Sequence, residues 1–291
     1  MSRELKVCAQ IAQAMKDGGY YNAVMSGGRE LDRVKQYIAA FAGEGNTVCA
    51  YPLQNPGYPC FPDLRHVPFR DDPSAAPGTA MLEQSFETIR DEYLDLRDDE
   101  WVVYNPMGNC WMVYFFYHMG VDLDALTKRC PKTSEIVKAL PRVCLDYPWG
   151  DVLFSVHASD AHLVSHCSID NLRVRCHLGV QVPENCEMRV GTEKRGWEVG
   201  KGLLFEDSFE HEVWNRGTTR RAILIVDFWH PDLTDVEIEA LTAGFRKSDV
   251  RRIFLLQRIQ NVSNTKAHIE YLEAAMARQD KESLLRQYWK R

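Results

Sequence analysis

Between residues 100 and 230, short runs of β-branched and aromatic residues follow one another, separated by turns rich in Gly, Pro and Asn. Such runs, punctuated by turn residues, are typical of β-strands. Many short strands of this kind favour a sandwich or a jelly-roll barrel over a parallel sheet. We expect strands at 101–104, 111–117, 151–156, 172–182, 187–190, 202–206 and 221–229.

Helical patterns flank this β region on both sides. Apolar residues recur at helical spacing within residues 1–43, interrupted by two Gly-Gly pairs, whereas residues 44–79 are rich in Pro and Gly and should be irregular. Further helices are expected at 80–96, 133–139, 236–245, 250–259 and 266–289. The pattern predicts three parts: an N-terminal helical extension (1–54), a β domain (55–235) and a C-terminal helical extension (236–291).

The composition excludes several classes of protein. With 45% hydrophobic and 26% charged residues, the chain is typical of soluble globular proteins. The apolar stretch at 111–121 is much shorter than the about 20 residues that a membrane-spanning helix needs. The N-terminus has no apolar core of the signal-peptide type. We therefore expect a cytoplasmic protein without a membrane partner.

Charge and cysteine content agree with that expectation. Residues 245–291 carry 11 Lys or Arg against 5 Asp or Glu, although the whole chain has a net charge of −6. These cations alternate with Leu, Ile and acids, which favours a mixed-charge helical surface over nucleic-acid binding. The nine cysteines are an odd number without a CxxC pair, so we expect them to be reduced and buried.

The segment 172–182 (LRVRCHLGVQV) contains the clearest sign of a binding site. Successive side chains on a strand point to opposite faces. One face therefore carries Leu and Val with Cys176, and the other carries Arg173, Arg175 and His177. Arg221 opens the very apolar strand 221–229, where its guanidinium could grip a carboxylate with two hydrogen bonds. Together these cations favour an anion site over a solvated surface strand.

Two histidines could hold a metal. His166 and His211 are expected on different strands of the barrel, an arrangement that suits a two-histidine, one-carboxylate iron site. The acid of that motif would stand two residues after the first histidine, where this chain has Ser168. Spacing alone therefore leaves open that both histidines are structural.

The neighbours of these histidines carry weaker expectations. Asp207 and Glu212 could accept hydrogen bonds that orient His211. The nearby histidines at 157 and 162 should be surface or supporting residues. Large aromatic residues in this region, Trp214, Phe228 and Trp229, are expected in the core rather than against a substrate.

Several segments resemble the aspartyl/asparaginyl β-hydroxylase family of Fe(II)- and 2-oxoglutarate-dependent oxygenases. The resemblance covers roughly residues 55–235, and its most specific parts are DSFEHEVWN (207–215) and the strand that ends in WHPDL. The other matching segments are YPCFPDL (58–64), LEQSFETIRDEY (82–93), CPKT (130–133), the Phe154-Ser155 pair, HCSIDNLRVRCHLGV (166–180), GWEVGKGLLFE (196–206) and RAILIVDFWHPDL (221–233).

The resemblance implies a cupin-like double-stranded β-helix core and a set of site residues. His166 and His211 would be the iron ligands, and a water would complete the site because the family has a glycine where this chain has Ser168. Ser155, Arg175, His177 and Arg221 match the positions that bind 2-oxoglutarate. Arg173 matches a position that holds the substrate carboxylate, and Arg175 could share that role.

The implied reaction is the hydroxylation of an unactivated C–H bond with O₂, while 2-oxoglutarate is converted to succinate and CO₂. Because the sequence shows no anchor or signal, we expect a small-molecule or peptide substrate. The favoured carbon is the β-carbon of an Asp- or Asn-like, carboxylate-bearing residue, either free, carrier-bound or in a peptide.

Two alternatives remain at this point. One is a jelly roll that binds a metal or a ligand without catalysis, which the extra helices and Ser168 would allow. The other is an oxidative halogenase, since a missing acid opens a coordination position for chloride. The sequence says nothing of the oligomeric state.

Overall fold

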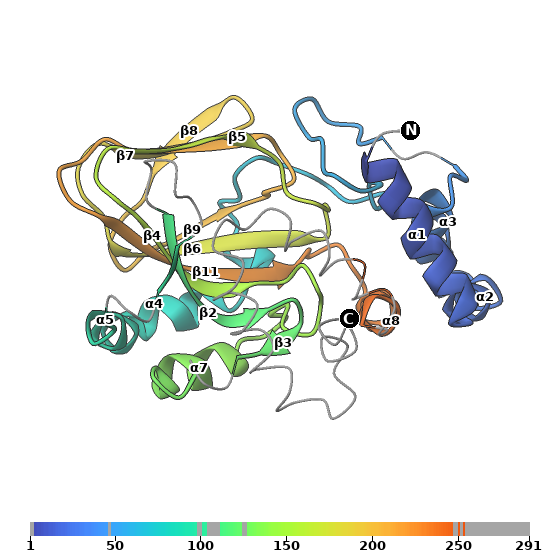
Figure 1. The fold of residues 1–291 in the computed structure, drawn as a ribbon, viewed down its shortest axis with the longest axis horizontal. Coiled ribbons are helices and arrows are strands. Elements are labelled where there is room, and N and C mark those ends of the chain that lie inside the picture. The colour runs from blue at the N-terminus through green and yellow to red at the C-terminus, as the bar shows by residue number, and fades with distance from the viewer. Residues whose placement is uncertain are drawn as a thin grey trace, which may run out of the picture.

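The computed structural model describes residues 3–45, 48–97, 101–103, 111–123, 127–246, 250 and 253. Two antiparallel sheets face each other and form a jelly-roll core (Figure 1). The larger sheet has the order β1-β2-β4-β11-β6-β9, with β3 beside β2, and the smaller has the order β5-β10-β7-β8. The expected double-stranded β-helix fold is confirmed.

The strands have the following bounds. The larger sheet contains β1 (Val102–Val103), β2 (Trp111–His118), β3 (Val121–Asp122), β4 (Val152–His157), β6 (Arg173–Gln181), β9 (Gly202–Phe205) and β11 (Arg221–Trp229). The smaller sheet contains β5 (Ala161–His166), β7 (Cys186–Val190), β8 (Glu193–Gly196) and β10 (His211–Asn215).

The strand β11 lies at the centre of the larger sheet and is buried along its whole length. It pairs with β4 on one side and β6 on the other, so that Ile225 lies opposite both Leu153 and His177. Burial on both faces explains why its sequence is an almost continuous apolar run rather than an alternating one. The polar residues that interrupt this run, at its two ends, therefore lie inside the protein.

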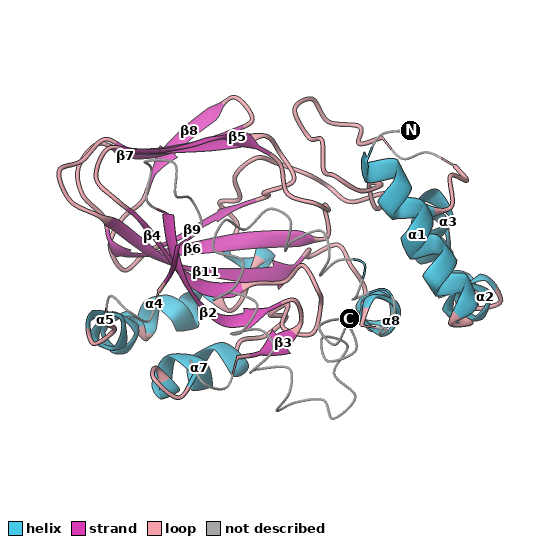
Figure 2. Ribbon diagram, in the orientation of Figure 1, coloured by secondary structure: helices cyan, strands magenta, loops and turns pink. Residues whose placement is uncertain are grey.

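Helices cover the outer face of the larger sheet (Figure 2). They are α4 (Thr79–Gln84), α5 (Phe86–Leu94) and α7 (Pro131–Lys138). The apolar face predicted for the strand at 172–182 packs on this side: Cys176 is fully buried, and the Thr79 hydroxyl of α4 contacts its sulfur at 4.0 Å. The opposite face of β6, with Arg173, Arg175 and His177, is thereby turned toward the space between the two sheets.

The remaining helices form a second group beside the barrel (Figure 1). They are α1 (Arg3–Asp17), α2 (Tyr20–Met25), α3 (Asp32–Phe41), α8 (Asp235–Phe245) and the short 3₁₀ helix η1 (Arg29–Leu31). A second 3₁₀ helix, η2 (Pro73–Ala75), precedes α4 in the chain and is not part of this group. The N-terminal helices pack on α8, where Arg33 pairs with Glu237 at 2.5 Å and the Tyr20 hydroxyl donates to the Ala240 carbonyl at 2.6 Å. Helices from the two ends of the described chain thus support each other.

Most of the expected elements are confirmed within a few residues. The helix expected at 80–96 is divided at Ser85 into α4 and α5. The expected strand at 101–104 is described only as β1, and the helices expected at 250–259 and 266–289 lie outside the described residues apart from 250 and 253. The division into three domains stays a prediction.

Four strands, β3, β5, β8 and β10, lie outside the strand ranges expected from the sequence. The two that matter most are β5 (AHLVSH) and β10 (HEVWN), because they carry the candidate metal ligands. Both mix polar and apolar residues, since the smaller sheet has one face toward the solvent, so neither stands out as an apolar run.

One expectation about the cysteines is wrong. Cys49 and Cys60 form a disulfide, with their Cα atoms 5.4 Å apart, because the irregular segment between them turns back on itself. The other described cysteines are in the thiol form; five of them are buried and Cys167 is half-buried. Among the described helices, not one combines the length and the apolar character needed to cross a membrane.

Candidate active site

His166 and His211 form what we call the metal pair. His166 ends β5, His211 begins β10, and the two lie directly opposite each other in register, with ring centroids 4.1 Å apart. In each ring Nδ1 contacts a backbone carbonyl two residues earlier, Val164 at 2.8 Å and Phe209 at 2.9 Å. Because a carbonyl oxygen can only accept, each Nδ1 carries the hydrogen and each Nε2 keeps its lone pair for a metal.

The electrostatics of the metal pair agree with this tautomer. His166 is exposed to solvent, whereas His211 is buried. Desolvation by the surrounding residues lowers the pKa of His166, and burial places that of His211 well below its usual range, so both rings are neutral at pH 7. Neutral imidazole is the form that binds iron. Ser168 cannot supply a carboxylate, and its hydroxyl accepts a hydrogen bond from Arg173 at 2.5 Å. The donor set therefore fits an iron ion held by two histidines, with its other positions open to water and small ligands.

Ser155, His177 and Arg221 form the anion cradle. Arg221 is 1% exposed, no carboxylate among the described residues pairs with it, and its Nε has no acceptor. Its guanidinium lies over the Trp197 ring at 4.8 Å. Burial lowers its pKa to about 10, which leaves it charged at neutral pH. A buried cation without a counterion is costly, so this position calls for a bound anion.

The other two members of the cradle also have unused donors. The Trp197 indole N–H donates to Nδ1 of His177 at 3.3 Å, so the hydrogen of this neutral ring is on Nε2, which has no partner. Burial places the pKa of His177 well below its usual range. Ser155 accepts from the Trp111 indole at 3.0 Å and keeps its own hydrogen to donate. One cation and two neutral donors fit the far carboxylate of 2-oxoglutarate.

The anion cradle and the metal pair share one side of the barrel. The Phe205 ring lies 4.7 Å from that of His177 and 5.8 Å from that of His211, centroid to centroid. Arg221 is the cross-strand partner of His157, which is buried rather than on the surface, and Ile223 is the partner of Ser155. The Phe205 ring thus packs against one histidine of each group, so the two groups lie close enough for one ligand to reach both.

Arg173 and Arg175 differ from Arg221 because they already have acidic partners. Asp227 accepts from Arg173 at 2.8 Å and from Arg175 at 2.7 and 2.8 Å. Arg173 also contacts Asp170 at 3.2 Å, and Arg175 lies 3.2 Å from Asp207. Burial raises the pKa of the Asp207 carboxyl, whose oxygens have no hydrogen bond of good geometry. The roles expected for the two arginines stay predictions.

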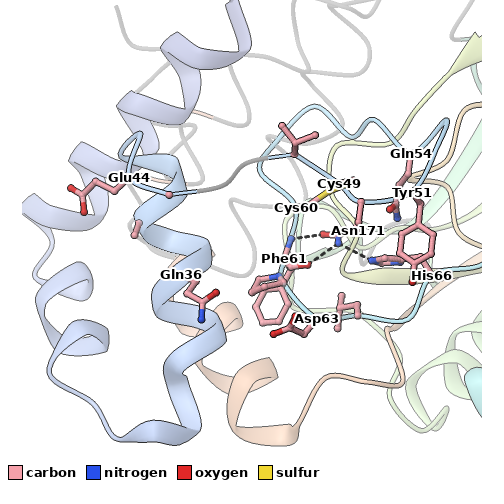
Figure 3. Close-up of a pocket in the computed structure, with 16 residues that line it drawn as sticks. Gln36, Glu44, Cys49, Tyr51, Gln54, Cys60, Phe61, Asp63, His66 and Asn171 are labelled. Atoms are coloured by element: carbon pink, nitrogen blue, oxygen red, sulfur yellow. Dashed lines mark hydrogen bonds between the residues drawn. A yellow bond between two sulfur atoms is a disulfide. The ribbon is translucent and has the colours of Figure 1, made fainter.

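A second group, the His66 cluster, also has ligand-type residues. Atoms of His66, Glu206 and His230 lie within 4.8 Å of one another, and all three residues are buried. Arg70 donates to Glu206 at 2.5 and 2.8 Å and lies 2.8 Å from Nε2 of His230. Nδ1 of His66 donates to the Glu206 carboxylate, and its Nε2 accepts a hydrogen bond from the Asn171 side-chain amide at 3.0 Å (Figure 3).

The His66 cluster is therefore already saturated. Both ring nitrogens of His66 are engaged, and Nδ1 of His230 accepts from the backbone N–H of Asp232 at 3.2 Å. A guanidinium holds the place that a metal would take. Sequence reasoning missed this cluster because His66 lies in the irregular segment, where no periodic pattern marks it. Its residue types resemble those of an iron site, but its hydrogen bonds are those of a cluster that stabilises the fold.

Some expected neighbours of the metal pair lie elsewhere. Glu212 does not orient His211; it accepts from His162 at 2.7 Å and from Arg189 at 3.1 Å. The acceptor for His211 is the Phe209 carbonyl rather than either of the acids expected to orient it. Trp214 stacks on His162 and is only half-buried, whereas Phe228 and Trp229 are in the core as expected.

Comparison with known proteins places the chain in a family. Residues 83–231, half of the chain, match the model of the family described as aspartyl/asparaginyl beta-hydroxylase. The aspartate beta-hydroxylase domain-containing protein 2 of Xenopus tropicalis is 30% identical over 66% of this chain and 55% of its own length. The human aspartyl/asparaginyl beta-hydroxylase is 34% identical over 56% of this chain and 22% of its own. The chain spans about half the length of the first of these relatives.

Among solved structures, an oxidoreductase of the 2OG-Fe(II) oxygenase family from Burkholderia pseudomallei is similar with a TM-score of 0.33. It is 12% identical, and the similarity covers 60% of this chain and 98% of that one. Likeness at this level carries no argument about function, and the fold assignment rests on the strand order. The family match and the aligned segments that contain the metal pair and the anion cradle lead to one assignment: the chain belongs to the aspartyl/asparaginyl β-hydroxylase family.

Proposed function

We propose that this protein is an Fe(II)- and 2-oxoglutarate-dependent dioxygenase that hydroxylates an unactivated C–H bond. The observation that carries the proposal is that two histidines whose Nδ1 atoms carry the hydrogen lie on the same side of one barrel as the buried Arg221, with which no carboxylate among the described residues pairs. Membership of a family named for β-hydroxylation supports the reaction type. A purely structural barrel would have no use for an uncompensated cation at this depth.

Each group has a defined task in this proposal. His166 and His211 hold iron through Nε2, while the carbonyls of Val164 and Phe209 fix the ring orientations. Arg221, His177 and Ser155 bind the far carboxylate of 2-oxoglutarate, so that its keto-acid end points to the metal. When bound, iron and 2-oxoglutarate would activate O₂, of which one oxygen atom would enter the hydroxylated product and the other the succinate that is released with CO₂.

We propose different roles for Arg173 and Arg175 in substrate binding. Arg175 is the more exposed of the two, with 18% of its side chain accessible against 2% for Arg173. We assign contact with a carboxylate to Arg175, either of the substrate or of 2-oxoglutarate. Arg173 would hold Ser168 and Asp227 in position behind it.

The proposed substrate is a carboxylate-bearing amino acid, hydroxylated at the β-carbon and either free, carrier-bound or in a peptide. A cationic group beside the metal pair would recognise such a substrate through its carboxylate. We propose no nucleic-acid or membrane partner. The cytoplasmic location stays a prediction.

The first test follows the metal and the cosubstrate without a substrate. Anaerobic addition of Fe(II) and then 2-oxoglutarate should produce a weak visible charge-transfer band, and admission of O₂ should release succinate. Neither signal should appear with His211→Ala, and the band should require far more 2-oxoglutarate with Arg221→Ala. Absence of both signals in the unaltered protein would favour a non-catalytic binding protein.

The substrate is found by a second measurement. Candidate amino acids and peptides are incubated with the complete system in the presence of chloride, and products are examined by mass spectrometry. Gain of one oxygen atom supports hydroxylation, whereas replacement of one hydrogen by chlorine would support the halogenase instead.

A further inference from the structure

The segment 49–60, which we call the clasp loop, is closed by the Cys49–Cys60 disulfide. It runs between the N-terminal helices and the barrel (Figure 3). Both cysteines are half-buried and line a cavity of 570 Å³ together with Gln54 and His66, so a small reductant can reach the disulfide. The proposed reaction assigns no role to this loop, which ends before residues 83–231 that match the family model.

The clasp loop bonds to the segment that leads into His211. The backbone N–H of Glu210 donates to the Leu53 carbonyl at 2.7 Å, and that of Asn55 donates to the Ser208 carbonyl at 3.2 Å. The Gln54 amide reaches the Ser208 hydroxyl at 2.9 Å. These bonds enclose Phe209, whose carbonyl fixes the ring of His211.

The same loop bonds to the segment that follows His166. The backbone N–H of Gly57 donates to the Ser168 carbonyl at 3.2 Å, and that of Tyr58 donates to the Ile169 carbonyl at 2.8 Å. The two ligand segments are also joined directly, because the Ser168 N–H donates to the Asp207 carbonyl at 2.7 Å. The clasp loop therefore spans both sides of the metal pair.

We propose that the Cys49–Cys60 disulfide is a redox-sensitive staple that positions the metal pair. While the disulfide is intact, the clasp loop has few alternative conformations and holds both ligand segments in place. A dithiol reductant breaks the S–S bond in two steps. Its first thiolate attacks one cysteine sulfur and forms a mixed disulfide, and its second thiolate then attacks the reductant's own sulfur in that bond and releases the cysteine. The loop gains two electrons and two protons as two thiols, and the reductant becomes a cyclic disulfide.

The consequence is weaker metal binding in the reduced protein. Loss of groups that orient metal ligands typically lowers metal affinity about 10- to 100-fold, and release of the loop loosens both segments at once. The proposal rests on the proposed function, because it assumes that the metal pair binds a divalent ion. It adds redox regulation of metal affinity, which the family assignment does not include.

The test measures Co(II) affinity anaerobically by visible absorption and titration calorimetry. Oxidised protein is compared with protein reduced by a dithiol that is then removed by gel filtration, and alkylation with mass spectrometry confirms the thiol count. We expect at least about 10-fold weaker binding after reduction. Cys49→Ser with Cys60→Ser should bind as weakly as the reduced protein and should not respond to the reductant.

A matched control addresses the half-buried thiol beside the metal pair. Cys167→Ser should bind Co(II) as the oxidised protein does and should still lose affinity on reduction. Near-ultraviolet circular dichroism checks that each form is folded, and if the double variant does not fold, the oxidised and reduced native protein decide the result.

Equal Co(II) affinity of oxidised and reduced protein would overturn the staple and leave the proposed function standing. So would a double variant that binds as tightly as the oxidised protein. If oxidised protein did not bind Co(II) at all, both proposals would fail together.

Discussion

The metal pair and the His66 cluster contain the same kinds of side chain but have opposite hydrogen-bond states. In the metal pair, each Nδ1 donates to a backbone carbonyl, and among the described residues no hydrogen bond occupies either Nε2. In the His66 cluster, an arginine fills the centre, and both nitrogens of His66 have partners. Residue type alone would favour the cluster, because it includes a carboxylate. The tautomers reverse that choice, because a metal needs lone pairs that no donor already occupies.

Two arginines, the half-buried Arg70 and the fully buried Arg221, show the same contrast. Arg70 donates to Glu206, whereas Arg221 has no acidic partner in the part of the chain that the structure describes. Removing one partner of a desolvated ion pair destabilises a fold, whereas a buried cation without a partner indicates a site for a ligand. The comparison leads to variants whose effects should separate stability from ligand binding.

The largest effect is expected at the metal pair. His211→Ala removes one of two protein ligands and should abolish stoichiometric Co(II) binding and 2-oxoglutarate-dependent succinate release. Its matched control is His230→Ala, which should keep metal stoichiometry and lower the midpoint of urea unfolding. Equilibrium dialysis measures the first quantity and fluorescence the second. Loss of metal from the His230 variant, with retention in the His211 variant, would move the metal site to the His66 cluster.

The next effect concerns stability and its pH dependence. Although burial raises the pKa of Glu206, its contacts with His230, His66 and Arg70 outweigh burial and bring the pKa to about 2. A pKa below the usual 4.5 means that the stabilisation is complete above about pH 4.5 and is lost as the pH falls toward 2. The shift corresponds to about 3 kcal/mol.

Glu206→Gln should therefore lower the free energy of unfolding by about 3 kcal/mol at neutral pH. The difference from the native protein should shrink as the pH is lowered through that window. Urea titrations at several pH values measure both quantities. A pH-independent difference would mean that the charge of Glu206 is not what stabilises the cluster.

The sequence predicts which side chains share a face of a strand, but it does not predict how the strands pair. The alternation in 172–182 correctly separated the apolar face with Cys176 from the face with Arg173, Arg175 and His177, because strand geometry has a strict period of two. The position of His166 opposite His211 could not be predicted in this way. Register depends on pairing between β5 and β10, two short polar strands whose pattern is weak.

Long-range pairing explains the other failures. The clasp loop and the His66 cluster join residues 49–66 to residues 168–232, and no local pattern encodes such contacts. The disulfide was missed for the same reason, since cysteine spacing does not determine connectivity. Expectations about residues next to His211 in sequence failed because adjacent strand residues point to opposite faces, as Glu212 does.

A smaller effect is expected for Arg221→Ala at the anion cradle. The charge-assisted hydrogen bonds to a carboxylate contribute about 1.5 to 3 kcal/mol, so the apparent KM for 2-oxoglutarate should rise about 10- to 150-fold. Metal affinity should not change, because in the part of the chain that the structure describes the Arg221 guanidinium stacks on Trp197 and not on either ring of the metal pair. Arg220→Ala, an exposed neighbour, is the control and should leave KM unaltered. An unchanged KM in the Arg221 variant would remove the anion cradle from 2-oxoglutarate binding.

The smallest effect tests whether the hydrogen-bond state of His177, rather than its presence, matters to the cradle. Trp197→Phe keeps an aromatic face for the Arg221 guanidinium but removes the indole N–H that holds Nδ1 of His177 as an acceptor. The ring can then place its hydrogen on either nitrogen, and only one tautomer donates to a bound carboxylate. Loss of one neutral hydrogen bond should weaken the binding of 2-oxoglutarate by about 1 kcal/mol. Its KM should therefore rise about 5-fold, with kcat nearly unchanged. ¹⁵N chemical shifts of His177 measure the tautomer directly. If the shifts of native and variant protein agree while KM rises, Trp197 acts through packing against Arg221, and the cradle depends on a fixed cation more than on a fixed tautomer.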